Sequence, residues 1–402
     1  GQWHYETRAH PPVDGLHQQT GAFTAFPANS SSNRFLRHGA LQVSASGHYL
    51  EHADGTPFFW LADTAWSGPL KSSPDEWSTY LADRAAKGFT GVQFVTTPWR
   101  GAPADRDGQT AYRTGESLTI QPAFFQRLDE RIDAINDAGL LAIPVLLWAL
   151  GDVSTTPGKL PEPQAVRLAR YITARYGAHH TVWFLTGDAS FSSAWWDRGR
   201  RLARSVFRHG ARDVAWTLRK AIRRPNPAAY WRRLGRAVFA KPTHSSLASA
   251  HPQAGQWEVD QLRSESWYDL LAYQSGHGGD AETVQWIHSG PPAHSESEAA
   301  AVPVINAEPG YEDIVAGSDG GRHTAADIRQ QAYYSLLSTP PAGLAYGAHG
   351  VWSWETEPGV PHNHPGTGVA RPWHEALHFP GSTHLQHLVE LFDQVAWPHL
   401  RP

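Results

Sequence analysis

Short apolar segments alternate with amphipathic segments along most of this chain of 402 residues. The apolar segments are nearly continuous runs, as expected of strands that are buried on both faces. The segments between them space their apolar residues as helices do, and Gly88, Gly139 and Gly177 follow three of them as helix-stop signals. Eight strands are expected, at 58–63, 91–98, 141–148, 181–188, 245–251, 268–277, 302–308 and 343–354.

This order of elements predicts an α/β fold, a (β/α)8 TIM barrel, with a doubly wound open sheet as the competing architecture. Residues 40–57 predict a hairpin before the first barrel strand, with Asp54-Gly55 as its turn. Residues 1–34 show no periodicity, and we expect an extended arm that lies on the surface or is partly disordered. The expected organisation is an arm at 1–34 and one barrel domain at 35–402, which includes an arginine-rich helical insertion at 195–240.

Composition excludes several classes of protein. There is no cysteine, so disulfides, thiolate nucleophiles and cysteine-ligated metals are ruled out. The net charge of −4 predicts no general attraction to nucleic acid or to anionic membranes. The most apolar run, 140–150, is too short to span a bilayer, so we expect a soluble chain with neither kind of partner.

The chain begins with Gly1 and contains no methionine, which is typical of a processed chain. A secretory signal could have been removed from it. We therefore expect a secreted, periplasmic or cell-surface protein, and a cytoplasmic location remains the alternative.

Two of the expected strands deliver a carboxylate at their C-terminal end. The segment HTVWFLTGD ends at Asp188, and Glu308 follows the apolar run of PVINAEPGYE. Active-site residues of barrels lie at this end of the strands, and strands four and seven face each other across the mouth. Two acids placed there can reach the separation of about 5–5.5 Å that retaining glycoside hydrolases need. The alternatives are a helix cap for Asp188 and a buried salt bridge for Glu308.

The remaining strand ends are rich in tryptophan, histidine and acidic residues, in a chain with 18 tryptophans. Flat apolar rings stack on the C–H face of sugars, so we expect a polar, aromatic cleft for a carbohydrate. Asp63 either binds a sugar hydroxyl or caps the first helix. No HExxH or paired-histidine spacing is present, so we expect no metal and no cofactor. The expected substrate-binding residues are Asp63, Trp66, Trp99, Trp148, His251, Gln274, His277, Tyr311, His349 and Trp354.

The segment from Trp195 to Arg236 is dense in arginine. Such charge runs are usually solvated helix faces. The alternative is an insertion after strand four that walls the cleft and favours an anionic, uronate-bearing glycan. Nucleic-acid binding is a weaker alternative, because aromatic residues on strands are not interleaved with the arginines.

Several motifs, in this order, resemble the apiosidase-like glycoside hydrolases, from about residue 36 to the C-terminus. They are LQVSASGHYLEHADGTPFFWLADTAW, WFLTGD, YDLLAYQSGHG, PVINAEPGYED and WHEALHFPGSTHLQHLVELF. The resemblance implies a (β/α)8 enzyme with Asp188 as the acid/base and Glu308 as the nucleophile. Thr186 stands where the family usually has a glycine, and the insertion after Asp188 looks longer than usual. The family often carries a C-terminal collagen-binding β-sandwich, and no such second core is seen here, so we expect a trimmed chain or a single-domain member.

The expected function is that of a retaining, exo-acting glycosidase. The resemblance implies release of a terminal furanose, apiose-like or arabinofuranose-like, from a glycan or glycoside by double displacement. A catalytically inactive, carbohydrate-binding barrel is the rival hypothesis, and the distance between Asp188 and Glu308 distinguishes the two. An interaction protein that uses the arginine-rich face is a third hypothesis.

Overall fold

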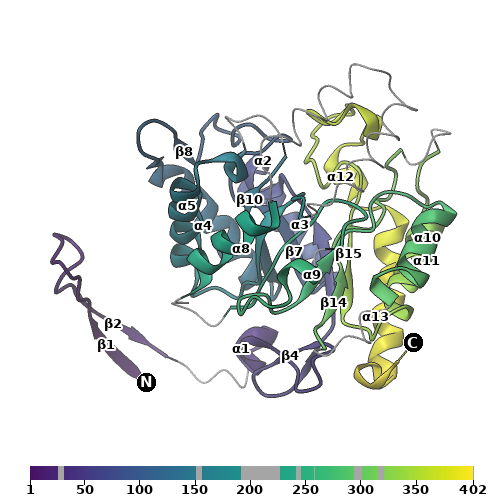
Figure 1. Cartoon of the computed structure of the whole chain (residues 1–402), viewed down its shortest axis with the longest axis horizontal. Helices are drawn as coiled ribbons and strands as arrows, with labels where there is room; N and C mark the ends of the chain where they lie inside the picture. The colour runs from purple at the N-terminus through teal and green to yellow at the C-terminus, as the bar shows by residue number, and fades with distance from the viewer. Residues whose placement is uncertain are drawn as a thin grey trace.

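A computed structural model describes residues 1–25, 31–150, 156–191, 227–240, 246–257, 259–293, 301–315 and 321–401. Within these residues a sheet of eight parallel strands curls around a buried core, and helices cover its outer face (Figure 1). In chain order the strands are β6 (Trp60–Thr64), β7 (Gly91–Val95), β10 (Leu141–Trp148), β11 (Trp183–Gly187), β12 (Ala248–Ser249), β13 (Leu271–Tyr273), β14 (Val304–Asn306) and β15 (Gly343–Tyr346). All eight expected strands are therefore present.

The order of the strands shows that the sheet is a barrel. Strands that follow each other in the chain are neighbours, and the last strand, β15, pairs with the first, β6. Strands β12 and β13 form the two edges of the sheet. The Asp269 N–H donates to the Ala248 carbonyl (2.9 Å), and the Ser249 hydroxyl donates to the Leu270 carbonyl (2.7 Å), so hydrogen bonds bridge the gap. The (β/α)8 prediction is confirmed, and the doubly wound alternative is wrong.

Local sequence signals explain where the helices begin and end. Helix α3 (Pro74–Ala86) starts with a capping box in which Ser73 and Glu76 satisfy each other's backbone N–H groups. Gly88 and Gly139 both have positive φ and follow helices, as their role as stop signals requires. The other longer helices are α4 (Pro122–Asp137), α5 (Glu162–Tyr176), α8 (Pro227–Phe239), α10 (Ala281–Ser289), α11 (Ala325–Leu337) and α13 (Pro380–Gln394).

Short elements complete the description of the chain. They are helices α1 (Arg34–His38), α2 (Gly68–Lys71), α9 (Val259–Leu262) and α12 (Trp373–Ala376), strands β8 (Tyr112–Arg113) and β9 (Thr119–Ile120), and 3-10 turns at Pro157–Lys159, Pro365–Thr367 and Trp397–His399. Among the described helices, none combines the length and the apolar character that crossing a bilayer would take.

The N-terminal region contains more structure than its sequence predicts. The predicted hairpin at 40–57 is present and belongs to a small antiparallel sheet of β3 (Leu41–Val43), β4 (Leu50–His52) and β5 (Pro57–Phe58). Residues expected to form an arm contain a second hairpin, β1 (Gln2–Glu6) with β2 (Thr20–Thr24). This hairpin projects from the rest of the molecule in Figure 1, and nearly all of its strand residues are exposed. Because neither strand buries a face, the alternation that identifies a strand is weak there.

Most of the arginine-rich insertion predicted at 195–240 lies outside the described residues. The described part, 227–240, consists mainly of α8. Arg236 on α8 forms an ion pair with the buried Glu265 (2.7 Å), and Arg233 pairs with Glu162 (2.9 Å). Both arginines are largely exposed, so these ion pairs add little, and the buried face of α8, which includes Trp231 and Leu234, packs the helix against the molecule.

Candidate active site

Asp188 owes its position to an unusual backbone turn at the end of β11. Gly187, the last residue of that strand, packs so closely under Trp148 that an added Cβ would lie 2.3 Å from the indole ring. Asp188 itself has φ of +50°, a left-handed conformation that aspartate tolerates better than most residues. Packing therefore requires glycine at position 187, and the backbone conformation at position 188 is one that aspartate tolerates.

Glu308 follows β14 on the far side of the barrel mouth. Its Oε2 atom lies 3.2 Å from His251 Nε2, and its Oε1 atom lies 3.2 Å from His277 Nε2. His251 is completely buried, whereas the His277 side chain is 32% exposed, so solvent reaches the site from the side of His277. Two imidazoles thus contact the two oxygens of one buried carboxylate.

The structure brings Asp188 and Glu308 together. One oxygen of each carboxylate and one ring nitrogen of His251 all lie within 4.8 Å of one another. Gln274 Nε2 donates to Asp188 Oδ1 at 3.5 Å, and Arg100 approaches Asp188 Oδ2 at the same distance. Both contacts are long, so Asp188 is held loosely compared with Glu308.

The surroundings separate the proton affinities of the two acids. Burial, reinforced by the nearby charge of Glu308, raises the pKa of Asp188, although Arg100 acts in the opposite direction. Burial would also raise the pKa of Glu308, but the contacts with His251 and His277 outweigh it and leave this pKa lowered. Asp188 therefore holds a proton at a pH at which Glu308 is ionised.

Aromatic side chains surround this pair. Trp66 Nε1 donates to the Tyr311 hydroxyl (3.0 Å), and the Trp66 ring lies edge-on to His251 with centroids 5.4 Å apart. The Tyr311 ring packs against His277 at 4.3 Å. Trp148 contacts Trp66 and Trp99, at 5.6 and 4.5 Å between centroids. The predicted residues Trp66, Trp99, Trp148, His251, Gln274, His277 and Tyr311 thus form one connected cluster with Asp188 and Glu308.

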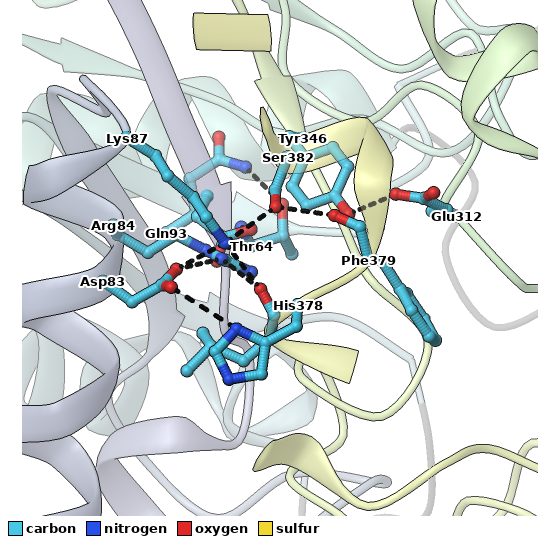
Figure 2. A network of polar contacts seen from close by, with 12 residues as sticks. Thr64, Asp83, Arg84, Lys87, Gln93, Glu312, Tyr346, His378, Phe379 and Ser382 are labelled. Carbon is cyan, nitrogen blue, oxygen red and sulfur yellow. Dashed lines mark hydrogen bonds and ion pairs between the residues drawn. The ribbon is translucent and has the colours of Figure 1, made fainter. Parts of the chain in front are cut away.

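The structure contradicts the prediction that Asp63 binds a sugar hydroxyl or caps the first helix. Its Oδ2 atom accepts a hydrogen bond from Arg84 Nε (2.5 Å), and both side chains are fully buried. Arg84 also contacts Asp83 and donates to the Leu377 carbonyl, in a polar network that Figure 2 shows reaching Ser382. Asp63 neither binds at the site nor caps a helix, because it points outward from the barrel and anchors α3.

The structure also contradicts the prediction that Trp354 binds substrate. Its ring stacks on Trp373 (4.8 Å between centroids) and also packs against Trp77 and Tyr80 of α3. These contacts place the ring in the packing between the barrel and its outer helices. Trp354 is therefore not among the residues that the structure gathers around Glu308.

Trp352 takes the place that was expected for Trp354. Its ring lies 6.3 Å from Tyr311 and 4.9 Å from His364, between ring centroids. Trp352 Nε1 donates to His349 Nδ1 (3.1 Å), and burial lowers the pKa of His349 to about 4. The predicted His349 thus acts as a neutral acceptor that orients Trp352, one layer behind the candidate site.

Sequence reasoning missed three residues at the site, namely Arg100, Trp352 and His364. Arg100 lies in the tight turn after β7, in which Trp99 and Ala102 exchange backbone hydrogen bonds (2.9 and 3.0 Å). Its place directly after Trp99, a predicted strand end, is the signal that would have identified it. His364 lies on the long connection after β15, where sequence order gives no indication of proximity.

Comparison with known proteins identifies the family and the fold of the chain. The family described as "Apiosidase-like, catalytic domain" matches residues 44–399. A search of curated proteins found no match. Among solved structures, a glycoside hydrolase family 5 protein from Bacteroides vulgatus is similar with a TM-score of 0.69 and 22% identity, over 89% of this chain and 72% of that chain. An endo-1,4-beta-mannanase from Rhizomucor miehei is similar with a TM-score of 0.53 and 13% identity, over 77% and 90% of the two chains.

Proposed function

Because the chain belongs to the apiosidase-like catalytic-domain family and is a glycosidase, we propose that it hydrolyses glycosides with retention of anomeric configuration. We further propose that it acts in the exo mode and releases a terminal furanose, apiose-like or arabinofuranose-like. The furanose and the exo mode rest on the resemblance to the family. The retaining mechanism rests on the geometry of the two carboxylates.

The separation of Asp188 and Glu308 is the observation that supports this proposal most directly. Their nearest donor atoms lie within 4.8 Å. Retaining enzymes place the two carboxyl groups about 5–5.5 Å apart, so that one can attack the anomeric carbon. Inverting enzymes need about 6.5–9.5 Å, because a water molecule stands between the base and the sugar. The nearest-atom separation in this structure lies below the inverting range, which supports the retaining mechanism.

The opposite pKa shifts of the two acids support the proposed roles. Asp188, whose pKa is raised, protonates the glycosidic oxygen and later deprotonates the attacking water. Glu308, whose pKa is lowered, attacks the anomeric carbon as a carboxylate and forms the glycosyl-enzyme. His251, His277 and Tyr311 lie next to Glu308 and favour its ionised form or its position. The aromatic rings around the pair offer stacking surfaces for the sugar.

A panel of aryl furanosides and pyranosides, followed by NMR of the first product, tests the proposal. We expect hydrolysis of a furanoside, with the newly formed sugar in the configuration of the substrate. A product that first forms with the opposite configuration would overturn the retaining mechanism. Turnover of pyranosides alone would overturn the furanose assignment.

Substitution of each acid tests the assigned roles. Glu308→Gln is expected to abolish turnover, and Asp188→Asn to lower it about 10²- to 10⁴-fold, the usual contribution of a general acid. For Asp188→Ala, we expect added azide to restore turnover of an aryl glycoside and to yield a glycosyl azide of retained configuration. Glu312→Gln is the matched control, because Glu312 belongs to the same motif but binds Tyr346 and the Gly381 N–H. A Glu308→Gln protein with normal activity would contradict the assignment of Glu308 as the nucleophile. Sugar binding without any turnover by the wild-type protein would favour a binding role for the barrel.

A further inference from the structure

We propose that Asp188, His251 and Glu308 form a binding site for a zinc-like divalent transition-metal ion, which competes with the substrate. One donor atom from each residue lies within 4.8 Å of the other two, and all three residues are buried. One imidazole nitrogen and two carboxylate oxygens are donors that zinc accepts in proteins. The metal site goes beyond the proposed function, and only the expected competition with substrate rests on it.

One of the three distances between the donor atoms already fits a tetrahedral ion, and a small movement of Asp188 would bring in the third ligand. Zinc bonds to nitrogen and oxygen are about 2.0–2.2 Å long, which puts neighbouring ligand atoms of a tetrahedron about 3.3–3.6 Å apart. The 3.2 Å between His251 Nε2 and Glu308 Oε2 is close to this value. Asp188 needs to approach by at most about 1.5 Å, as judged from the same tetrahedron. Its contacts with Gln274 and Arg100 are both 3.5 Å long, so a rotation of its carboxylate breaks no strong bond.

Donor atoms of two of the three residues, His251 and Glu308, also lack a well-formed hydrogen bond, although they lie 3.2 Å from each other. Within the described residues, neither ring nitrogen of His251 nor Oε2 of Glu308 has a hydrogen-bond partner of acceptable geometry. Buried polar atoms without a protein partner usually meet a ligand, an ion or a water molecule. The Trp66 and Phe184 rings pack against the His251 ring, at 5.4 and 5.7 Å between centroids, and fix its direction. A fixed imidazole that faces a carboxylate is a preorganised pair of ligands.

The nature of the donors selects the metal. Magnesium prefers six oxygen ligands and keeps several waters, which this buried site with one nitrogen does not provide. Zinc, copper and nickel accept imidazole readily. The positive charge of the Arg100 guanidinium, which lies 3.5 Å from Asp188, repels a metal ion and lowers the affinity of the site for it. A bound ion would occupy the lone pair with which Glu308 attacks and the oxygen on which Asp188 carries its proton, so metal and substrate exclude each other.

Zinc chloride is the probe for the test. Equilibrium dialysis of the wild-type protein is expected to show one tightly bound zinc per chain. His251→Ala and Asp188→Asn are each expected to weaken that binding by at least about tenfold. The control is His387→Ala, which removes an exposed histidine that contacts Glu390 (3.2 Å) and should leave zinc binding and turnover unchanged. Circular dichroism checks that each variant is folded.

Kinetics provide the second measurement. With a hydrolysed aryl glycoside, zinc is expected to raise KM without changing kcat, and magnesium at the same concentration to have no effect. Equal zinc affinity in wild type, His251→Ala and Asp188→Asn would place the ion at another of the 23 histidines and overturn the site. Zinc inhibition that lowers kcat alone would overturn the competition. Dialysis requires no turnover, so the metal site can be judged even if the proposed hydrolysis fails.

Discussion

Tyr311 shows how a single side chain connects the candidate site. Its hydroxyl accepts a hydrogen bond from Trp66 Nε1 (3.0 Å), which leaves its own proton free to point at Glu308. Burial, together with the negative charge of Glu308, raises the pKa of Tyr311 well above its usual value. The Tyr311 hydroxyl therefore stays protonated and available as a donor to Glu308, the nucleophile of the proposed mechanism.

Tyr311→Phe should lower kcat roughly 10- to 100-fold, because a hydrogen bond to a charged group contributes about 1.5–3 kcal/mol. The measurement is steady-state hydrolysis of an aryl glycoside. Tyr333→Phe, at a position that is 39% exposed on α11, serves as the matched control. Unchanged kcat in Tyr311→Phe would show that the hydroxyl does not act on Glu308.

At the scale of elements, a buried ion pair fixes helix α3 against strand β6. Arg84 of α3 binds Asp63 of β6, and its guanidinium lies over the rings of Tyr80, Phe89 and Tyr346 at 5.3–5.7 Å. The same network joins Lys87 to the Leu377 carbonyl and to Ser382, at the start of the last helix (Figure 2). Helix α3 and the C-terminal segment are therefore held together by polar contacts.

Asp63→Asn should destabilise the protein by about 3–5 kcal/mol, because it leaves the Arg84 charge buried without its partner. The double variant Asp63→Asn with Arg84→Met should recover part of that loss. Chemical denaturation measures both. Glu162→Gln, which breaks the exposed pair with Arg233, should cost far less stability than Asp63→Asn, because solvent screens exposed ion pairs. A similarly small cost for Asp63→Asn would mean that the ion pair does not hold α3.

At the scale of the whole molecule, the closure of the barrel between strands β12 and β13 involves the carboxyl group of Asp269. Asp269 Oδ2 accepts a hydrogen bond from the Ala248 N–H (2.8 Å), beside the backbone bond that joins the same residues. Burial raises the pKa of Asp269 from 3.8 to about 6, although the Ala248 bond opposes this. The folded state therefore holds this proton more tightly than the unfolded chain does.

The stability contributed by protonated Asp269 is complete below about pH 4 and is lost as the pH rises to about 6. Asp269→Asn keeps an oxygen acceptor but cannot ionise. The Tm of the variant minus the Tm of wild type should therefore be larger at pH 7 than at pH 4. Thermal unfolding of both proteins at the two pH values measures this difference. An identical Tm difference at the two values would contradict the raised pKa.

The expected strands predicted the barrel, and their C-terminal ends included Asp188 and Glu308, which the structure brings together. The role predicted for Asp63, another strand-end residue, was wrong. Parallel strands are buried on both faces, so their sequence does not tell which residues point inward. On β6, Thr64 accepts a hydrogen bond from Gln93 (3.1 Å) inside the barrel, and the adjacent Asp63 points out to Arg84. Similarly, Trp352 and Trp354 are two residues apart, and the left-handed φ of Trp354 (+56°) sends it to the outer helices.

The amino-acid sequence alone was sufficient to establish the eight strands and the Gly187-Asp188 and Glu308 strand ends, because these depend on local patterns. The distance between Asp188 and Glu308, the approach of Arg100 and the contacts of His251 depend on segments far apart in the chain. Barrel closure brings those segments together, and only the tertiary structure shows that closure. The same reason explains the candidate metal site, whose three ligands come from three separate strand ends and follow no spacing motif.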